Sequence, residues 1–196
     1  TPLQMADGFA VFANGGYRVN PTLVLKVTDG RGHLLAQYRP NVLDESMRGI
    51  NARNAFVMNS LLQEVARTGT AARAQATLKR PDLYGKTGTT NDSMDAWFAG
   101  YHPSLVAVVW IGYDQPRKLG DRETGGGLAL PVWIDYMATA LRNTPVTELS
   151  PPEGVVNIGG EWFYEEYTRS SGVRDVGLQS PDAEEGAPSA PSASEK

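Results

Sequence analysis

The sequence predicts an α+β domain in which a three-stranded antiparallel sheet packs against helices. Two observations predict the sheet: β-branched and aromatic residues dominate 96–101 and 105–113, and a turn at 102–104 joins these runs. A further strand is predicted around Lys86, directly before them, so the three strands form a meander. The helices are predicted because apolar residues recur at helical spacing in several other segments.

The first predicted helix begins at the first residue of the sequence. Thr1 is a suitable N-cap, Pro2 fits the first turn, and the residues Asn-Gly-Gly at 14–16 end the helix. Two β-rich runs at 22–28 and 33–38 then flank a glycine-containing turn, which is typical of a hairpin. We expect this hairpin to be peripheral.

The most regular helical pattern begins at Asn51, a plausible N-cap, and ends at residues 68–69, which read Thr-Gly. Residues 73–83 are predicted to be a loop, because charged residues are frequent and Arg80 precedes a proline. This loop leads directly into the strand that carries Lys86.

Two more segments follow the predicted sheet. Residues 125–127 are three glycines and predict a flexible junction, and Pro131 is expected to begin a helix that ends at Leu141 and covers one sheet face. Three strands leave an edge that can pair with another chain. We therefore expect a part of the sheet to lie outside this sequence.

Composition divides the chain into three parts. Residues 1–144 are predicted to form the folded domain, and residues 145–179 a C-terminal extension rich in turn-forming, acidic and aromatic residues. Residues 180–196 are predicted to be disordered, because they consist mostly of Pro, Ala, Ser and Glu.

Composition also excludes several classes of function. A chain of 196 residues, 41% of them hydrophobic, can bury one core. The net charge of −4 and the absence of a basic run argue against nucleic acid as a partner. With no Cys and two His, we expect no metal and no cofactor. The apolar run at 105–111 is too short to span a membrane, and no signal peptide is recognisable.

Residues 86–90 carry the clearest chemical signal. They read KTGTT and place a lysine, a hydroxyl and a glycine consecutively. A nucleotide-binding P-loop is excluded, because position 80 is Arg80 and not glycine, although a plain surface strand remains an alternative. None of the eleven serines is followed by Lys three residues later or by Asn two residues later. The sequence therefore resembles part of an active site without its nucleophile.

Several segments match one family in the same order. They read TPL at 1–3, AVFANGG at 10–16, RPDL at 80–83, GKTGTTND at 85–92, DAWFAGY at 95–101, GG at 126–127 and PVW at 131–133. This series spans roughly residues 1–142 and resembles the class A penicillin-binding proteins, in particular the bifunctional 1A type. The resemblance identifies the chain as the C-terminal part of their transpeptidase domain.

The resemblance implies an incomplete penicillin-binding or β-lactamase-like transpeptidase fold and an acyl-serine mechanism. It implies that Lys86 is catalytic, assisting proton transfer and offsetting negative charge. Thr87 and Thr89 would bind the terminal carboxylate of the D-Ala-D-Ala stem peptide or the carboxylate of a β-lactam. The backbone N–H of Thr89 would be a catalytic oxyanion donor, and Gly88 would permit close approach of the substrate backbone.

The same resemblance implies partners and a location. The partners are peptidoglycan stem peptide, β-lactams and a missing N-terminal part that carries Ser-x-x-Lys and Ser-x-Asn. The parent protein would work at the periplasmic face of the bacterial inner membrane, although this chain shows no signal or anchor. We expect the chain alone to be inactive and to be marginally stable or to aggregate.

Two other functions are weighed against this one. The chain could be a non-catalytic module whose groove binds a peptide or a partner protein, or a fragment of a serine β-lactamase, which shares Lys-Thr-Gly. The segment NDSMDAWF at 91–98 and the long C-terminal tail argue against a β-lactamase fragment.

Other residues have simpler structural explanations. Asp92 and Asp95 are expected to cap turns more often than to act as an acid and base, and Asp95 is expected to anchor its loop. Glu165 and Glu166 are expected to be solvated. The large aromatic residues are expected to belong to the core and sheet faces: Trp97, Phe98, Trp110 and Trp133.

Overall fold

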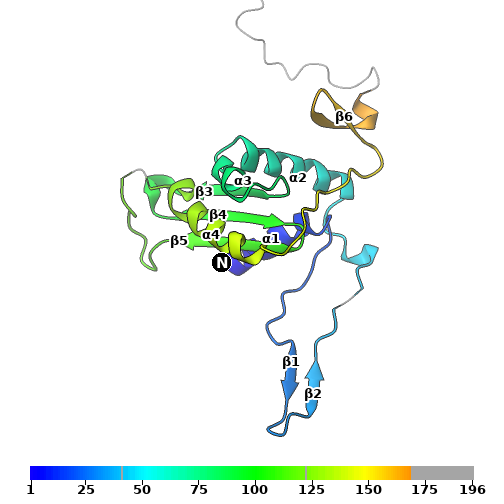
Figure 1. The fold of residues 1–196 in the computed structure, drawn as a ribbon, viewed down its shortest axis with the longest axis vertical. Helices are drawn as coiled ribbons and strands as arrows, with labels where there is room; N and C mark the ends of the chain where they lie inside the picture. Colours follow the sequence, from blue (N-terminus) through cyan, green and yellow to red (C-terminus); the bar gives the residue numbers. More distant parts are fainter. Residues whose placement is uncertain (41, 122, 169–196) are drawn as a thin grey trace, which may run out of the picture.

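The computed structural model describes residues 1–40, 42–121 and 123–168. A three-stranded antiparallel sheet in the order β3-β4-β5 lies among the helices, and the hairpin of β1 and β2 extends far from this body (Figure 1). The predicted α+β class and the three-stranded meander are confirmed. The helices are α1 (Pro2–Ala13), α2 (Ala52–Arg67), α3 (Ala72–Leu78) and α4 (Leu130–Ala140). The strands are β1 (Lys26–Thr28), β2 (Leu34–Gln37), β3 (Tyr84–Thr89), β4 (Ala96–His102), β5 (Leu105–Ile111), β6 (Val155–Ile158) and β7 (Glu161–Tyr164).

The two N-caps predicted for α1 and α2 are confirmed. The Thr1 side chain accepts a hydrogen bond from the backbone N–H of Gln4, and the Gln4 side chain accepts one from the backbone nitrogen of Thr1. The two bonds make a capping box. At α2, the Asn51 side chain accepts from the backbone N–H of Arg53 at 2.9 Å. The hairpin of β1 and β2 is exposed along both strands, as predicted, although each strand is shorter than its β-rich run.

The prediction of a loop at 73–83 is wrong, because α3 occupies most of it. Ala71 and Ala74 are fully buried there, and alanine is the best helix former. The helix ends at Lys79, which has a left-handed backbone at φ 52°, one residue before Arg80. The proline after Arg80 disfavours helical backbone only at Arg80 itself, so the alanines earlier in the segment can still be helical.

The prediction of a flexible junction at the three glycines is also wrong. Residues Gly125–Ala129 form a π-helical turn that continues into α4. The Thr124 side chain caps this turn by accepting from the backbone N–H of Gly127 at 3.0 Å. Gly125 is buried, and a Cβ built there would lie 2.3 Å from the backbone oxygen of Trp97. Glycine is therefore present for close packing and not for freedom of movement.

The central sheet has two unlike faces. Successive side chains of a strand point to opposite faces, so the pairs Lys86↔Ala99 and Gly88↔Trp97 fix which residues share a face. The open face is formed by Tyr84, Lys86, Gly88, Trp97, Ala99, Tyr101, Val106, Val108 and Trp110. The closed face is formed by Gly85, Thr87, Thr89, Phe98, Gly100, His102, Leu105, Ala107 and Val109.

The closed face holds the larger hydrophobic core. Trp133 of α4 is fully buried, and its ring centroid lies 5.0 Å from that of Phe98. The Trp133 indole N–H donates to the carbonyl oxygens of Gly100 at 3.3 Å and Ala107 at 3.1 Å. The core around them consists of Ala66, Ala71, Ala74, Leu83, Ala129, Leu130, Ile134, Met137 and Leu141. As predicted, α4 covers this face.

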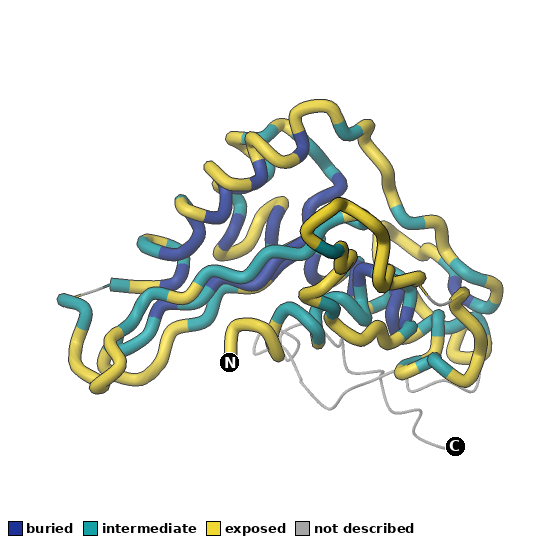
Figure 2. The backbone as a smooth tube through the Cα atoms, turned by 90° about the horizontal axis from the view of Figure 1, so that it is seen from below, coloured by how far each residue is buried: buried dark blue, intermediate teal, exposed yellow. Residues whose placement is uncertain are grey.

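The open face is packed at one end. There α1 contributes Phe9, whose ring centroid lies 6.3 Å from that of Tyr101, and Tyr101 stacks on Tyr84 at 5.1 Å. Toward the other end, Trp97 is half-buried and Trp110 is 36% exposed. Figure 2 shows buried residues along the sheet and the inward turns of the helices. At Lys86, α1 contributes Met5 and Phe9 to a groove on this face, and the Lys86 side chain is exposed.

A buried ionic cluster ties the start of β3 to the segment after α4. The Arg80 guanidinium donates to both carboxylate oxygens of Asp82, at 2.9 and 2.7 Å, and to the carbonyl oxygen of Thr144 at 2.7 Å. The backbone N–H of Thr147 donates to Asp82 at 2.8 Å. His102 Nε2 lies 3.1 Å from Asp82 Oδ2 without hydrogen-bond alignment. These contacts cross residue 144, and the domain boundary there stays a prediction.

The extension after residue 144 contains a second hairpin that its composition did not predict. Its Trp162 packs edge-to-face on Phe56 of α2, with ring centroids 4.9 Å apart. Glu166 is exposed, as expected, and its carboxylate also lies 2.8 Å from the Arg53 guanidinium. The predicted disordered tail at 180–196, and the end of the extension, lie outside the described residues.

Candidate functional site

The Lys-Thr-Gly segment lies in β3, at the border of the sheet. Lys86 begins on the open face, but its ammonium curls around the strand and donates to the Thr87 carbonyl oxygen at 2.9 Å and the Thr87 hydroxyl at 3.3 Å. The Thr87 carbonyl therefore points away from β4. Because alternate residues of an antiparallel strand turn their backbone groups to the same side, the Thr89 N–H points there too.

The outer backbone of β3 at residues 87–89 lies at the edge of the sheet. In Figure 1, α2 and α3 lie beside β3. No strand of the described chain pairs with the outer side of β3, whose sheet partner is β4. We call the outer backbone at 87–89 the free edge. An extended peptide can add to such an edge by main-chain hydrogen bonds.

The two threonine hydroxyls lie on the closed face of the strand. The Thr87 hydroxyl is 2.8 Å from the Thr70 hydroxyl, and the Thr89 hydroxyl accepts from the backbone N–H of Gly125 at 3.1 Å. The structure thus brings Lys86 and Thr87 into contact, with Thr70 beside them. Their proposed roles toward a substrate stay predictions.

Gly88 is the point where the strand packs against its neighbours. A Cβ built on Gly88 would lie 3.1 Å from the Cβ of Trp97, and a Cβ built on Gly125 would lie 2.5 Å from the Gly88 carbonyl oxygen. Both contacts are tighter than ordinary side chains allow. Glycine at position 88 is therefore required by packing within the sheet, whether or not a substrate also approaches it.

The loop after β3 is held by Asp95. Its carboxylate accepts from the indole N–H of Trp110 at 2.8 Å, and its backbone N–H donates to the Thr90 hydroxyl at 2.8 Å. The expectation that Asp95 anchors this loop is confirmed. Asp92 lies instead 3.8 Å from Lys118 Nζ, at a backbone φ of 60°.

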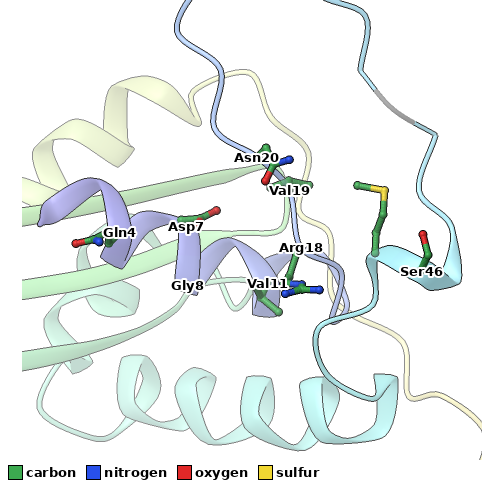
Figure 3. A pocket seen from close by; sticks show the side chains of 9 residues that line it. Gln4, Asp7, Gly8, Val11, Arg18, Val19, Asn20 and Ser46 are labelled. Atoms are coloured by element: carbon green, nitrogen blue, oxygen red, sulfur yellow. The ribbon is translucent and has the colours of Figure 1, made fainter.

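A shallow apolar groove of about 310 Å³ lies on the open face beside the motif. Its lining is Met5, Phe9, Lys86, Thr87, Gly88, Trp97 and Ala99. A larger hollow of about 660 Å³ lies between α1 and the segments that flank the β1–β2 hairpin, and none of its lining residues belongs to the motif (Figure 3). Residues of the motif therefore line the smaller groove, while the Lys86 ammonium and the threonine hydroxyls lie at the strand edge and on the closed face.

Two residues that contact the motif were missed in the sequence. Thr70 was passed over because the preceding Thr-Gly pair was interpreted as a helix end, and Gly125 because consecutive glycines indicate flexibility. A useful signal was available for the second, since three glycines directly before a regular helix leave room for close approach of another backbone. Thr70 gave no signal without the fold.

A lysine-bearing edge strand beside an apolar groove, in a sheet packed against helices, is the arrangement expected of a penicillin-binding transpeptidase domain. The family model for the penicillin-binding protein transpeptidase domain matches residues 1–138. The chain is 48% identical over 172 residues to penicillin-binding protein 1A of Neisseria flavescens, covering 87% of this chain and 21% of that protein. It is 40% identical over 204 residues to penicillin-binding protein 1A of Pseudomonas aeruginosa, covering 81% and 25%.

Solved structures agree with these relatives. The chain is similar to the crystal structure of penicillin-binding protein 1A from Haemophilus influenzae, with a TM-score of 0.77, 32% identity and coverage of 84% of this chain and 32% of that one. It is also similar to the D,D-transpeptidase domain of a peptidoglycan glycosyltransferase from Eggerthella lenta, with a TM-score of 0.57, 28% identity and coverage of 74% and 33%. The chain belongs to the penicillin-binding protein transpeptidase family, and its fold is that of the 1A transpeptidase domain.

The chain spans about a fifth of the length of the curated relatives it matches. Within its described residues, no helix is both long and apolar enough to cross a membrane. In the same residues, no three His, Cys, Asp or Glu side chains are grouped as metal ligands.

Proposed function

We propose that this chain supplies the Lys-Thr-Gly strand of a serine D,D-transpeptidase that cross-links peptidoglycan and is acylated by β-lactams. One observation carries the proposal. The Lys86 ammonium contacts the Thr87 carbonyl and hydroxyl at the free edge of β3, beside a groove in the open face, and strand alternation turns the Thr89 N–H to the same edge. An ammonium, a hydroxyl and an outward N–H are the groups that an acyl transfer from a carboxylate-bearing peptide needs.

Acyl transfer proceeds in two steps. A serine hydroxyl attacks the carbonyl carbon of the penultimate D-alanine, its proton passes to the leaving amine, and the terminal D-alanine departs. The amine of a second stem peptide then attacks the resulting ester and releases the serine. With a β-lactam the ring C–N bond opens and no leaving group departs, so the ester persists.

The residues of β3 have separate roles in this proposal. Lys86 assists the proton transfer and offsets developing charge, and the Thr89 N–H donates to the oxyanion, where loss of one donor costs about 10²–10³ in rate. The hydroxyls of Thr87 and Thr89 donate hydrogen bonds to the terminal carboxylate. The strand between Thr87 and Thr89 pairs with the extended substrate.

The serine itself must come from another part of the protein. The sequence has neither Ser-x-x-Lys nor Ser-x-Asn, so we propose that both lie in an N-terminal part, and that this chain alone is inactive. We call the protein that contains both parts the complete protein, and we propose that it works at the periplasmic face of the inner membrane. Residues 1–144 would complete its transpeptidase domain.

The test is covalent labelling by a fluorescent penicillin, read by intact mass. We expect no adduct on this chain alone and one adduct on the complete protein. In the complete protein, Lys86→Met should lower the acylation rate by about 10²–10⁴, the usual contribution of a positioned proton-transfer group. Lys26→Ala, in the exposed β1 strand, is the matched control and should leave the rate unchanged.

Three results would contradict the proposal. An adduct on this chain alone would require a nucleophile other than the expected serine. Absence of any adduct on the complete protein would argue for a non-catalytic binding module. Rapid release of hydrolysed penicillin would indicate a serine β-lactamase instead.

A further inference from the structure

The hydroxyls of Thr87 and Thr89 share one feature: the oxygen of each accepts a hydrogen bond from a protein N–H group. Thr89 Oγ1 accepts from the backbone N–H of Gly125 at 3.1 Å. Thr87 Oγ1 lies 3.3 Å from Lys86 Nζ and 2.8 Å from Thr70 Oγ1. A hydroxyl has one proton to donate and two lone pairs. When the lone pairs are occupied by donors, the proton is left for an external acceptor.

The direction of the Thr70 bond decides whether Thr87 is free to donate. An ammonium has no lone pair, so Lys86 occupies one lone pair of the Thr87 oxygen. If Thr87 donated to Thr70, its proton would be consumed inside the protein. If Thr70 donates to Thr87, the Thr87 proton is left to form a hydrogen bond to an external acceptor, such as an anion at the free edge.

Thr70 is held firmly enough to act in this way. It lies between the end of α2 and the start of α3, where the backbone N–H of Ala71 donates to the Val65 carbonyl at 3.1 Å. The backbone N–H of Ala72 donates to the Gly69 carbonyl at 3.0 Å. Ala71, the next residue, is fully buried against the core of the closed face. The backbone that carries Thr70 is therefore held by core packing, and its exposed side chain reaches the Thr87 hydroxyl from there.

We infer that Thr70 is a positioning residue for carboxylate recognition: its hydroxyl donates to Thr87 and thereby directs the Thr87 proton to the substrate carboxylate. This inference rests on the proposed function and adds to it a residue that the Lys-Thr-Gly motif does not include. Hydrogen bonds in a chain polarise one another, so the bond from Thr70 also strengthens the one that Thr87 makes to the anion. The ligand it selects is a penicillin or peptide with a free carboxylate.

The experiment compares two substrates in the complete protein. One is a penicillin with its free carboxylate, and the other is the methyl ester of the same penicillin, which lacks the anion. Acylation rates are measured by intact mass for the wild type, Thr70→Val, Thr70→Ser and Thr68→Val. Thr68 is the matched control, because its hydroxyl is an exposed neighbour that bonds to Glu64 and not to the motif.

We expect Thr70→Val to lower the acid-to-ester rate ratio by about 3- to 10-fold, the effect of one ordinary hydrogen bond. Thr70→Ser keeps a hydroxyl and should restore most of the ratio, and Thr68→Val should not change it. A purely structural effect of Thr70→Val would lower both rates equally and leave the ratio unchanged, which would overturn the inference.

The outcomes also separate this inference from the proposed function. If the wild type is acylated and all three variants keep its ratio, the role of Thr70 is wrong and the transpeptidase proposal stands. If Thr70→Ser loses as much of the ratio as Thr70→Val, the hydroxyl is not the cause, and the inference is overturned. If the wild type reacts with neither penicillin, both proposals fail together.

Discussion

The two faces of the central sheet carry different tasks on the same three strands. On the closed face, Phe98 and Trp133 are fully buried and hydrogen bonds fix the indole. On the open face, Lys86 is exposed, and 36% of the surface of Trp110 is accessible to solvent. The comparison indicates that the closed face stabilises the fold, whereas the open face leaves Lys86 exposed at the border where β3 has no strand partner among the described residues.

The largest expected effect is a difference between the two faces in what each contributes to the free energy of unfolding. Trp133→Ala empties the centre of the closed core and should lower the free energy of unfolding by about 3–5 kcal/mol. Trp110→Ala removes the same side chain from the open face, where it is already partly in water, and should cost clearly less. Urea unfolding of the two variants of the complete protein, followed by circular dichroism, makes the comparison. Equal losses would mean that the open face is packed like the closed one.

The second prediction concerns the ionic cluster at the end of the closed face. Burial alone would raise the pKa of Asp82, but the Arg80 guanidinium, the Thr147 N–H and the nearby His102 together hold that pKa below its usual value. Asp82→Asn removes the charge and should cost about 1.5–3 kcal/mol at pH 7, the range for hydrogen bonds to charged groups. Asp135→Asn, on the exposed side of α4, is the control and should have little effect.

The pH dependence has a definite sign. Because folding lowers the Asp82 pKa, the stabilisation is complete above the unfolded value of about 4 and is lost as the pH falls through the lower folded value. The stability difference between the wild type and Asp82→Asn should therefore shrink below about pH 4. Unfolding midpoints measured from pH 7 to pH 3 would show it. A difference that stays constant across this range would contradict the role of the Asp82 charge.

The third prediction concerns the glycine that supports β3 from the closed face. A Cβ on Gly125 would lie 2.3 Å from the Trp97 carbonyl oxygen and 2.5 Å from that of Gly88, and both atoms belong to the sheet backbone. Gly125→Ala should cost about 1–3 kcal/mol through overpacking and should lower acylation by displacing the motif. At Gly127 the nearest neighbour is Thr124 Oγ1 at 3.4 Å, so Gly127→Ala is a matched control. Similar losses for both variants would refute the close-packing explanation.

The sequence predicted most elements because their signals are local. The N-caps at Thr1 and Asn51, the apolar spacing of the helices and the β-rich runs of the meander each depend on a few neighbouring residues. The errors fell where distant contacts decide. The helix α3 forms where the closed core buries its N-cap Ala71 and its Ala74, and Gly125 packs closely because the sheet backbone lies against it.

The site was predicted in part for the same reason. Lys86, Thr87, Gly88 and Thr89 are consecutive, so one motif names them all. Thr70 lies 17 residues earlier, and its contact with Thr87 exists only in the folded chain. Local sequence can therefore identify the strand that carries the motif, but it cannot identify the residues of other elements that contact it.

The smallest effect tests whether the open face stays open in the complete protein. Met5 lines the groove beside Lys86 and is 41% exposed, while Met58 on α2 is 39% exposed. In this chain, replacing either methionine by alanine should lower the free energy of unfolding by less than about 1 kcal/mol, because each side chain is already partly exposed and buries little apolar surface.

If the N-terminal part covers the open face, Met5 becomes buried and Met58 does not. Oxidation of the complete protein by peroxide, mapped by peptide mass, should then proceed several-fold more slowly at Met5 than at Met58, because sulfoxide formation follows exposure. Equal rates would mean that the missing part leaves this end of the sheet in solvent, and that the groove beside Lys86 is built from the residues seen here.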